Sequence, residues 1–236
     1  MAENTLITTL SGWRFRKNLC IKGFNGFTLA EVLITLVIIG VIASMTIPTL
    51  MNNTNKQKYV SRLTKAYSTL KQGLNSIWQN NGVSPGDYEF LKTIDLIDEL
   101  AKVVAVQNKF NTIQEFTGET ISQKYRYLSG GSLTGMTDAK GIVTSDGQII
   151  TYLRYTSGAL YGLSTEDSEN VIGRFFVDVN GDKKPNKMGV DAYLFYLVKG
   201  KGIVPAGMED STTCRKNAGG QGCTAKVLKE KAINYI

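Results

Sequence analysis

The chain has 236 residues, of which 42% are hydrophobic and 20% are charged, and its formal net charge is +7. It contains no histidine, which excludes Ser-His-Asp and Cys-His catalysis and every zinc site that needs a histidine ligand. We therefore expect a protein that is not an enzyme.

Residues 1–26 form a short segment with four basic residues and one acidic residue. A basic segment ahead of an apolar run predicts that the N-terminus stays in the cytoplasm while the rest of the chain crosses the membrane. We interpret residues 1–26 as a leader that is removed. A conventional secretory signal peptide fits less well, because the apolar run is longer than the usual core of about 7–15 residues.

The stretch from Phe27 to Ile47 is apolar apart from one charged residue, Glu31. As a helix with a rise of about 1.5 Å per residue it would be roughly 31 Å long, the thickness of the hydrocarbon core of a bilayer. We expect one transmembrane helix over residues 27–47, with a kink at Pro48. A charge inside a membrane is costly, so Glu31 either caps the helix or snorkels at its end, or it awaits a positive partner from another chain.

The sequence from Gly26 to Pro48 resembles the N-terminus of type IV pilins and type II secretion pseudopilins. The shared features are a glycine, a following phenylalanine, a glutamate five residues after the glycine, and a long apolar run. The resemblance implies that a prepilin peptidase cleaves between Gly26 and Phe27 and that Phe27 is then N-methylated. It also implies that Glu31 pairs with the free amine of a neighbouring subunit, and that Pro48 is the helix-kinking proline of the family.

A second Gly-Phe pair, Gly23-Phe24, offers an alternative cleavage position. Cleavage there would make Glu31 the eighth mature residue and would leave Gly26 in the first turns of the helix. Because glycine in a helix interior costs about 1 kcal/mol, we favour cleavage after Gly26.

The function that the resemblance implies is that of a structural subunit of a type II secretion pseudopilus or a type IV pilus. Its partners would be other copies of itself and other pilins, the prepilin peptidase, an inner-membrane assembly platform, and membrane lipid before assembly. The protein would span the inner membrane once, with its C-terminal domain outside. The alternative is a membrane-tethered extracytoplasmic domain that binds a ligand or catalyses a reaction. The short cluster at residues 125–127 is too weak to suggest a nucleic-acid partner.

Beyond Pro48, apolar residues recur at three- and four-residue steps, which predicts that the helix continues as an amphipathic segment over residues 53–80. Asn80-Asn81-Gly82 is a helix stop signal, so the N-terminal helix should occupy residues 27–81. Helical spacing returns from Tyr88 to Val106 and predicts a second, shorter helix.

The remaining chain favours strands, and residues 82–236 are expected to form a C-terminal globular α+β domain. The hairpin signal Asp146-Gly147 divides two β-rich runs within residues 142–153, and further strands are expected at 171–179 and 192–198. Three or four antiparallel strands packed on the apolar half of the long helix would cover both apolar faces. The resemblance to pilins implies the same α+β architecture.

Cysteines occur at three positions, one of which, Cys20, lies in the leader. Cys214 and Cys223 remain in a segment that we place outside the cytoplasm, where the environment is oxidising, so we expect a disulfide between them. Two unpaired thiols are the alternative.

An acidic loop at residues 178–191 is a candidate calcium site. Asp178, Asn180 and Asp182 have alternating spacing, and Asp191 follows, so the loop offers the oxygen ligands that calcium prefers. The loop departs from an EF-hand, and its aspartates, asparagines and glycines are also ordinary turn formers. We expect no other cofactor.

Overall fold

The computed structural model describes residues 26–136, 139–209 and 212–236 of the chain. The chain divides into two compact units, residues 1–48 and 49–236, and each is described by itself. Apart from Gly26, the expected leader, including Cys20, lies outside the described residues.

Helix α1 extends from Leu29 to Asn80 and confirms the long N-terminal helix. In the first unit its side chains are mostly apolar and almost all exposed, and this part is long and apolar enough to cross a membrane. Pro48 lies inside the helix, where its missing N–H removes one backbone hydrogen bond. The kink expected there stays a prediction.

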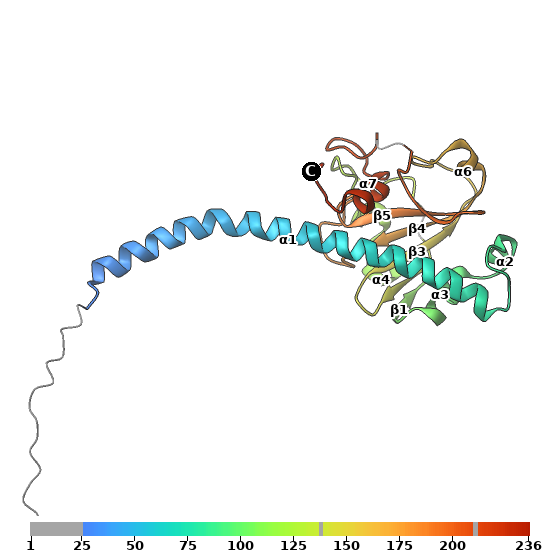
Figure 1. Cartoon of the computed structure of the whole chain (residues 1–236), viewed down its shortest axis with the longest axis horizontal. Coiled ribbons are helices and arrows are strands. Elements are labelled where there is room, and N and C mark those ends of the chain that lie inside the picture. Colours follow the sequence, from blue (N-terminus) through green and yellow to red (C-terminus); the bar gives the residue numbers. More distant parts are fainter. Residues whose placement is uncertain (1–25, 137–138, 210–211) are drawn as a thin grey trace, which may run out of the picture. The chain divides into compact units, whose positions relative to one another are not determined.

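In the second unit, one face of α1 is buried against a β-sheet. Leu63 and Ala66 are fully buried, Leu70 is 1% exposed, and Tyr67 stacks on Phe195 of the sheet with 5.6 Å between ring centroids. The recurrence at three- and four-residue steps places these side chains on one side of the helix, as the amphipathic pattern predicted. Figure 1 shows this part of α1 running across the strands.

The sheet has six antiparallel strands in the order β1-β2-β3-β4-β5-β6, so each strand pairs with its neighbours in sequence. The strands are β1 (Val106–Phe110), β2 (Gly141–Thr144), β3 (Ile149–Arg154), β4 (Val171–Asp178), β5 (Ala192–Val198) and β6 (Gly202–Pro205). The predicted hairpin and the two predicted later strands are confirmed. The expected count of three or four strands is wrong, because the sheet has six. The two strands that were not predicted are β1, which has an exposed polar centre, and β6, which is only four residues long.

Both faces of the sheet are buried. One face packs with α1 in a hydrophobic cluster that includes Ile150, Phe175 and Phe195. The other face packs in a second cluster that includes Phe176 and Tyr196, covered by the segment that contains α4 (Ile113–Thr117) and α5 (Ile121–Lys124). Every residue of β5 is therefore buried, unlike a strand with one wet face.

The single helix predicted from Tyr88 to Val106 is wrong, because the structure has two helices there. Helix α2 spans Tyr88–Thr93 and α3 spans Leu96–Val103, and Ile94 between them is extended. Asp95 starts the second helix, because its carboxylate accepts hydrogen bonds from the N–H groups of Ile97 and Asp98 and so caps the N-terminus of α3. A further short helix, α6, spans Thr165–Glu169.

Helix α7 (Cys223–Glu230) lies against β5 and begins at Cys223. Cys223 forms a disulfide with Cys214, and this bond was expected from the sequence. Both cysteines are buried, in a small cluster with Leu128 and Val190. Gly189, at φ +75°, gives this cluster room, because a Cβ atom there would lie 2.8 Å from the Cys223 sulfur. The disulfide thus fixes the start of α7 to the rest of the domain.

We expect the double substitution Cys214→Ala with Cys223→Ala to lower the unfolding free energy of residues 49–236 by about 2.5–3 kcal/mol. The reason is that the open chain gains conformational entropy in the unfolded state. Urea denaturation measures this change, and the fragment is suitable because the buried hydrophobic residues of the described chain lie between Val60 and Ile233. A reducing agent should destabilise the parent fragment equally and leave the double variant unchanged. Equal stability of parent and variant would contradict the expectation.

Candidate functional site

The residues expected at the cleavage position lie just before α1. Gly26, Phe27 and Thr28 have no regular secondary structure, and the Phe27 side chain is 87% exposed. A Cβ atom added at Gly26 would meet no atom of the described residues within 4 Å.

Glu31 forms a capping box with Thr28 at the start of α1. The Glu31 carboxylate accepts hydrogen bonds from the N–H of Thr28 at 2.8 Å and from its hydroxyl at 2.7 Å, and the Glu31 N–H donates back to that hydroxyl at 3.2 Å. This is one of the two interpretations left open by the sequence. Glu31 forms no ion pair within the part of the chain that the structure describes, so a cationic partner would have to be supplied from outside it.

The acidic loop, residues 178–191, connects β4 to β5 and places two carboxylates in the protein interior. Asp178 is fully buried and accepts hydrogen bonds from the N–H groups of Asn180 and Gly181 and from the Tyr125 hydroxyl. Burial, together with the nearby Asp191 carboxylate, raises the pKa of Asp178 well above its ordinary value.

Asp191 is the second buried carboxylate, and it closes the far end of the loop. It accepts hydrogen bonds from the N–H groups of Asn186 at 2.8 Å and Lys187 at 2.6 Å. Burial raises the pKa of Asp191 to about 6. The structure therefore brings Asp178 and Asp191 together in a buried environment that disfavours their charges.

Asp182, the third predicted carboxylate ligand, has a different environment. Its side chain is 61% exposed and pairs with the ammonium group of Lys124, which is itself buried. No group of three or more His, Cys, Asp or Glu side chains with the arrangement of a metal site occurs within residues 26–136, 139–209 and 212–236. The alternating spacing of the loop does not bring its three aspartates to one point.

Two amide oxygens in the same loop are buried without a hydrogen-bond partner among the described residues. They belong to Asn180 and Asn186. The Asn180 amide nitrogen donates to the Lys184 carbonyl at 3.1 Å, whereas its buried amide oxygen accepts no hydrogen bond from the described residues. Sequence reasoning missed Asn186, because its position relative to Asp191 depends on the loop conformation and not on ligand spacing.

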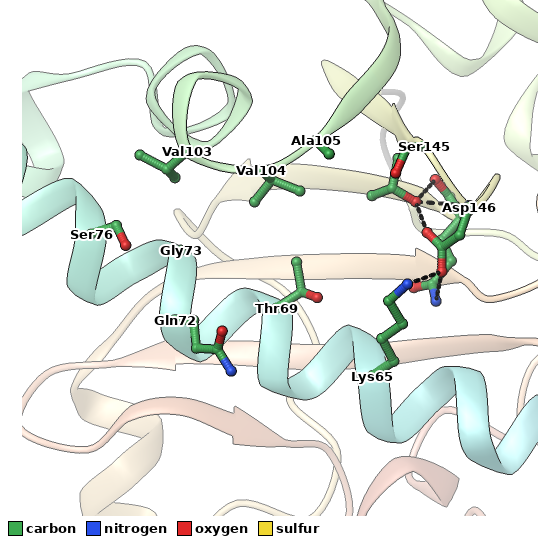
Figure 2. A pocket seen from close by; sticks show the side chains of 12 residues that line it. Lys65, Thr69, Gln72, Gly73, Ser76, Val103, Val104, Ala105, Ser145 and Asp146 are labelled. Atoms are coloured by element: carbon green, nitrogen blue, oxygen red, sulfur yellow. Dashed lines mark hydrogen bonds and ion pairs between the residues drawn. The ribbon is translucent and has the colours of Figure 1, made fainter.

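A polar cavity of about 270 Å³ lies between α1, the end of α3 and the β2–β3 turn (Figure 2). Its lining includes hydroxyl and amide side chains, which makes it the place to test the enzymatic alternative. Lys65 and Asp146 form an ion pair of 2.9 Å at its edge, and the Thr144 hydroxyl donates to Asp146 at 2.6 Å. The same hydroxyl accepts the N–H of Gln148 at 3.0 Å, so these contacts close the hairpin turn.

The electrostatics of this cavity favour a structural role for Asp146. Partial burial acts to raise its pKa, but hydrogen bonds from Thr144 and Lys65 hold the pKa of Asp146 below its ordinary value. A carboxylate with a lowered pKa is a weak general base, and this one is already paired. Asp146 is therefore poorly suited to activate a hydroxyl group in the cavity that Figure 2 shows.

Comparison with known proteins gives two matches. Residues 21–47 match the family model of the prokaryotic N-terminal methylation motif. The chain is also 30% identical, over 110 residues, to the type II secretion system core protein G of Escherichia coli strain K12, which corresponds to 45% of this chain and 73% of that protein. No solved structure matches the chain.

Proposed function

Because the chain belongs to the family of type IV pilins and type II secretion pseudopilins, we propose that it is a structural subunit of a secretion pseudopilus or a pilus. The observation that carries this proposal is the methylation motif, which lies at the start of an exposed, apolar helix joined to a folded α+β domain. The name of the relative favours the pseudopilus of a type II secretion system.

The first proposed step is processing by a prepilin peptidase between Gly26 and Phe27, followed by N-methylation of Phe27. The support is that these residues are exposed and lie outside α1, so an enzyme can reach the backbone without unfolding the helix. The leader, residues 1–26, would be removed, and the mature protein would consist of the helix, residues 27–81, and the domain of residues 82–236.

The second proposed step is insertion and assembly. The subunit would be held in the inner membrane by residues 27–47, with its basic leader in the cytoplasm and its domain outside. Apolar helices would then exchange lipid for contacts with other subunits at the assembly platform. In that setting the Glu31 carboxylate would pair with the amine of Phe27 on a neighbouring subunit, which offsets the cost of burying either charge.

We also propose that the acidic loop binds calcium. Asp178 and Asp191 would supply carboxylate oxygens, and the partnerless oxygens of Asn180 and Asn186 fit a cation that takes oxygen ligands. A bound cation would offset the free-energy cost of burying two neighbouring carboxylates and would fix the conformation of the β4–β5 connection. Asp182 was part of the expected ligand set, but its ion pair with Lys124 makes it the weakest member.

We predict that the chain purified from membranes of cells with an active prepilin peptidase starts at N-methylated Phe27, and that cells lacking the peptidase retain residues 1–26. Intact mass combined with N-terminal sequencing identifies the first residue and its methylation in the protein from both kinds of cell. Substitution Gly26→Ile should block processing, because the proposed cleavage directly follows this glycine, whereas Gly23→Ile should leave the product unchanged. A chain cut after Gly23 or near residue 50 would contradict the proposed site.

We predict that Glu31→Ala is inserted and cleaved but gives few filaments, because breaking a buried charge pair typically costs about 3–5 kcal/mol. The yield of sheared filaments relative to membrane-bound subunit is the measurement. The variant Glu31→Gln separates the two roles, since glutamine can still form the capping box but carries no charge.

Thr28→Ala is the matched control for this pair, because it removes the two hydrogen bonds of the cap that use the Thr28 hydroxyl and keeps the Glu31 carboxylate. If pairing is the role of Glu31, Glu31→Gln fails like Glu31→Ala while Thr28→Ala assembles. The opposite pattern would show that helix capping alone accounts for Glu31.

We predict that calcium in excess raises the melting temperature of residues 49–236 by about 5–10 °C at 100 times its dissociation constant. That concentration corresponds to about 2.7 kcal/mol of added stability, and one kcal/mol shifts a domain of this size by about 2–4 °C. Scanning calorimetry after chelation, with and without added calcium, measures the shift. The double variant Asp178→Asn with Asp191→Asn should lose the response and Asp182→Asn should keep it. An unchanged melting temperature, together with no binding heat in titration calorimetry, would exclude the site.

A further inference from the structure

A hollow at the start of the second unit has no role in the proposed assembly of the helix or in the proposed calcium site. This hollow, which we call the basic hollow, has a volume of about 560 Å³. Its lining includes Asn52, Lys56 and Tyr59 from α1, Lys184 and Val190 from the acidic loop, and Ile236.

The basic hollow has the two-sided chemistry of a site for an anionic amphiphile. Lys56 and Lys184 both line it, and neither forms an ion pair with any residue that the structure describes. The side chains of Val190 and Ile236 supply an apolar wall. Unpaired cations beside apolar surface attract a ligand that carries both a negative charge and hydrocarbon.

The position of the basic hollow along the chain points to the membrane surface. Exposed apolar side chains of α1 continue as far as Met51, which is 59% exposed, and Asn52 is the first polar residue of the hollow. From Asn52 to Lys56 the helix rises by about 6 Å, which matches the roughly 5–7 Å of headgroup layer on each side of a bilayer. The hollow therefore begins where the apolar run ends.

We propose that the basic hollow binds the headgroup of an anionic phospholipid while the subunit is in the membrane. Lys56 and Lys184 would contact the phosphate, and the apolar wall would cover the glycerol and the upper part of the acyl chains. The inference rests on the proposed membrane location, but it concerns a different site from Phe27 and Glu31. Lysines close to an anionic membrane surface each add to binding, so the hollow would hold the domain against the bilayer until assembly removes it.

The test is titration calorimetry on the full chain in a neutral detergent. The probes are dihexanoylphosphatidylglycerol below its micelle concentration, dihexanoylphosphatidylcholine, and inorganic phosphate. We expect the phosphatidylglycerol to bind at least about tenfold more tightly than either of the others, because only it combines net charge with hydrocarbon. Equal affinity for inorganic phosphate would show a free-anion site and would overturn the proposal, as would the absence of any binding of the phosphatidylglycerol.

Paired variants decide whether the hollow itself is the site. Lys56→Gln with Lys184→Gln should weaken phosphatidylglycerol binding about thirtyfold, as expected for the loss of two lysines at an anionic headgroup. Lys58→Gln with Lys183→Gln is the matched control, since it removes the same charge from neighbouring exposed positions that do not line the hollow. Equal losses in both pairs would indicate a diffuse basic surface and would overturn the proposal. Failure here leaves the cleavage and filament experiments unaffected, so it is distinguishable from failure of the proposed function.

Discussion

The burial of one face of α1 against the sheet is the interaction on which the rest of the structure depends. Fully burying one large aliphatic side chain is worth roughly 1.5–3 kcal/mol, and Leu63 and Leu70 on this face are at most 1% exposed. The same residue type at positions 33 and 36 of the same helix is 54% and 60% exposed. One helix therefore has a segment whose apolar side chains are buried by its own domain and a segment whose apolar side chains stay exposed in the described chain. This division explains why a folded domain and an assembly element can share a single continuous element.

The parts that could be predicted from the sequence are those in which periodicity is local and strong. The long helix and the hairpin around Asp146-Gly147 follow from residues close in sequence, and both are present. Strand β1 could not be predicted, because Gln107, Asn108 and Lys109 are exposed at the edge of the sheet and show no apolar alternation. The break between α2 and α3 was hidden for another reason. The apolar spacing continues across it, whereas the extended backbone at Ile94 and the capping hydrogen bonds by which Asp95 starts α3 interrupt the helix.

The acidic loop shows the same limit at the level of a site. Its composition suggested oxygen ligands, but the fold decides which of them meet. The antiparallel register pairs Asp178 with Ala192, so the carboxylates of Asp178 and Asp191 are brought to the same end of the β4–β5 ladder. Asp182 instead forms an ion pair with Lys124, which lies 58 residues earlier in the chain. Ion pairs between distant segments depend on tertiary structure, and no spacing rule within the loop could have indicated this one.

Glu31 has two roles, one observed and one proposed. Its carboxylate caps α1 in the isolated subunit, and we propose that it forms a charge pair in the filament. The two roles are compatible in their geometry. The capping box holds the carboxylate beside the N–H of Thr28, one residue from the amine that cleavage would create at Phe27. Negative charge is also favoured at a helix N-terminus by the aligned peptide dipoles. The cap therefore positions the charge at the level of the new N-terminus, and assembly has only to bring a neighbouring amine to a carboxylate that is already in place.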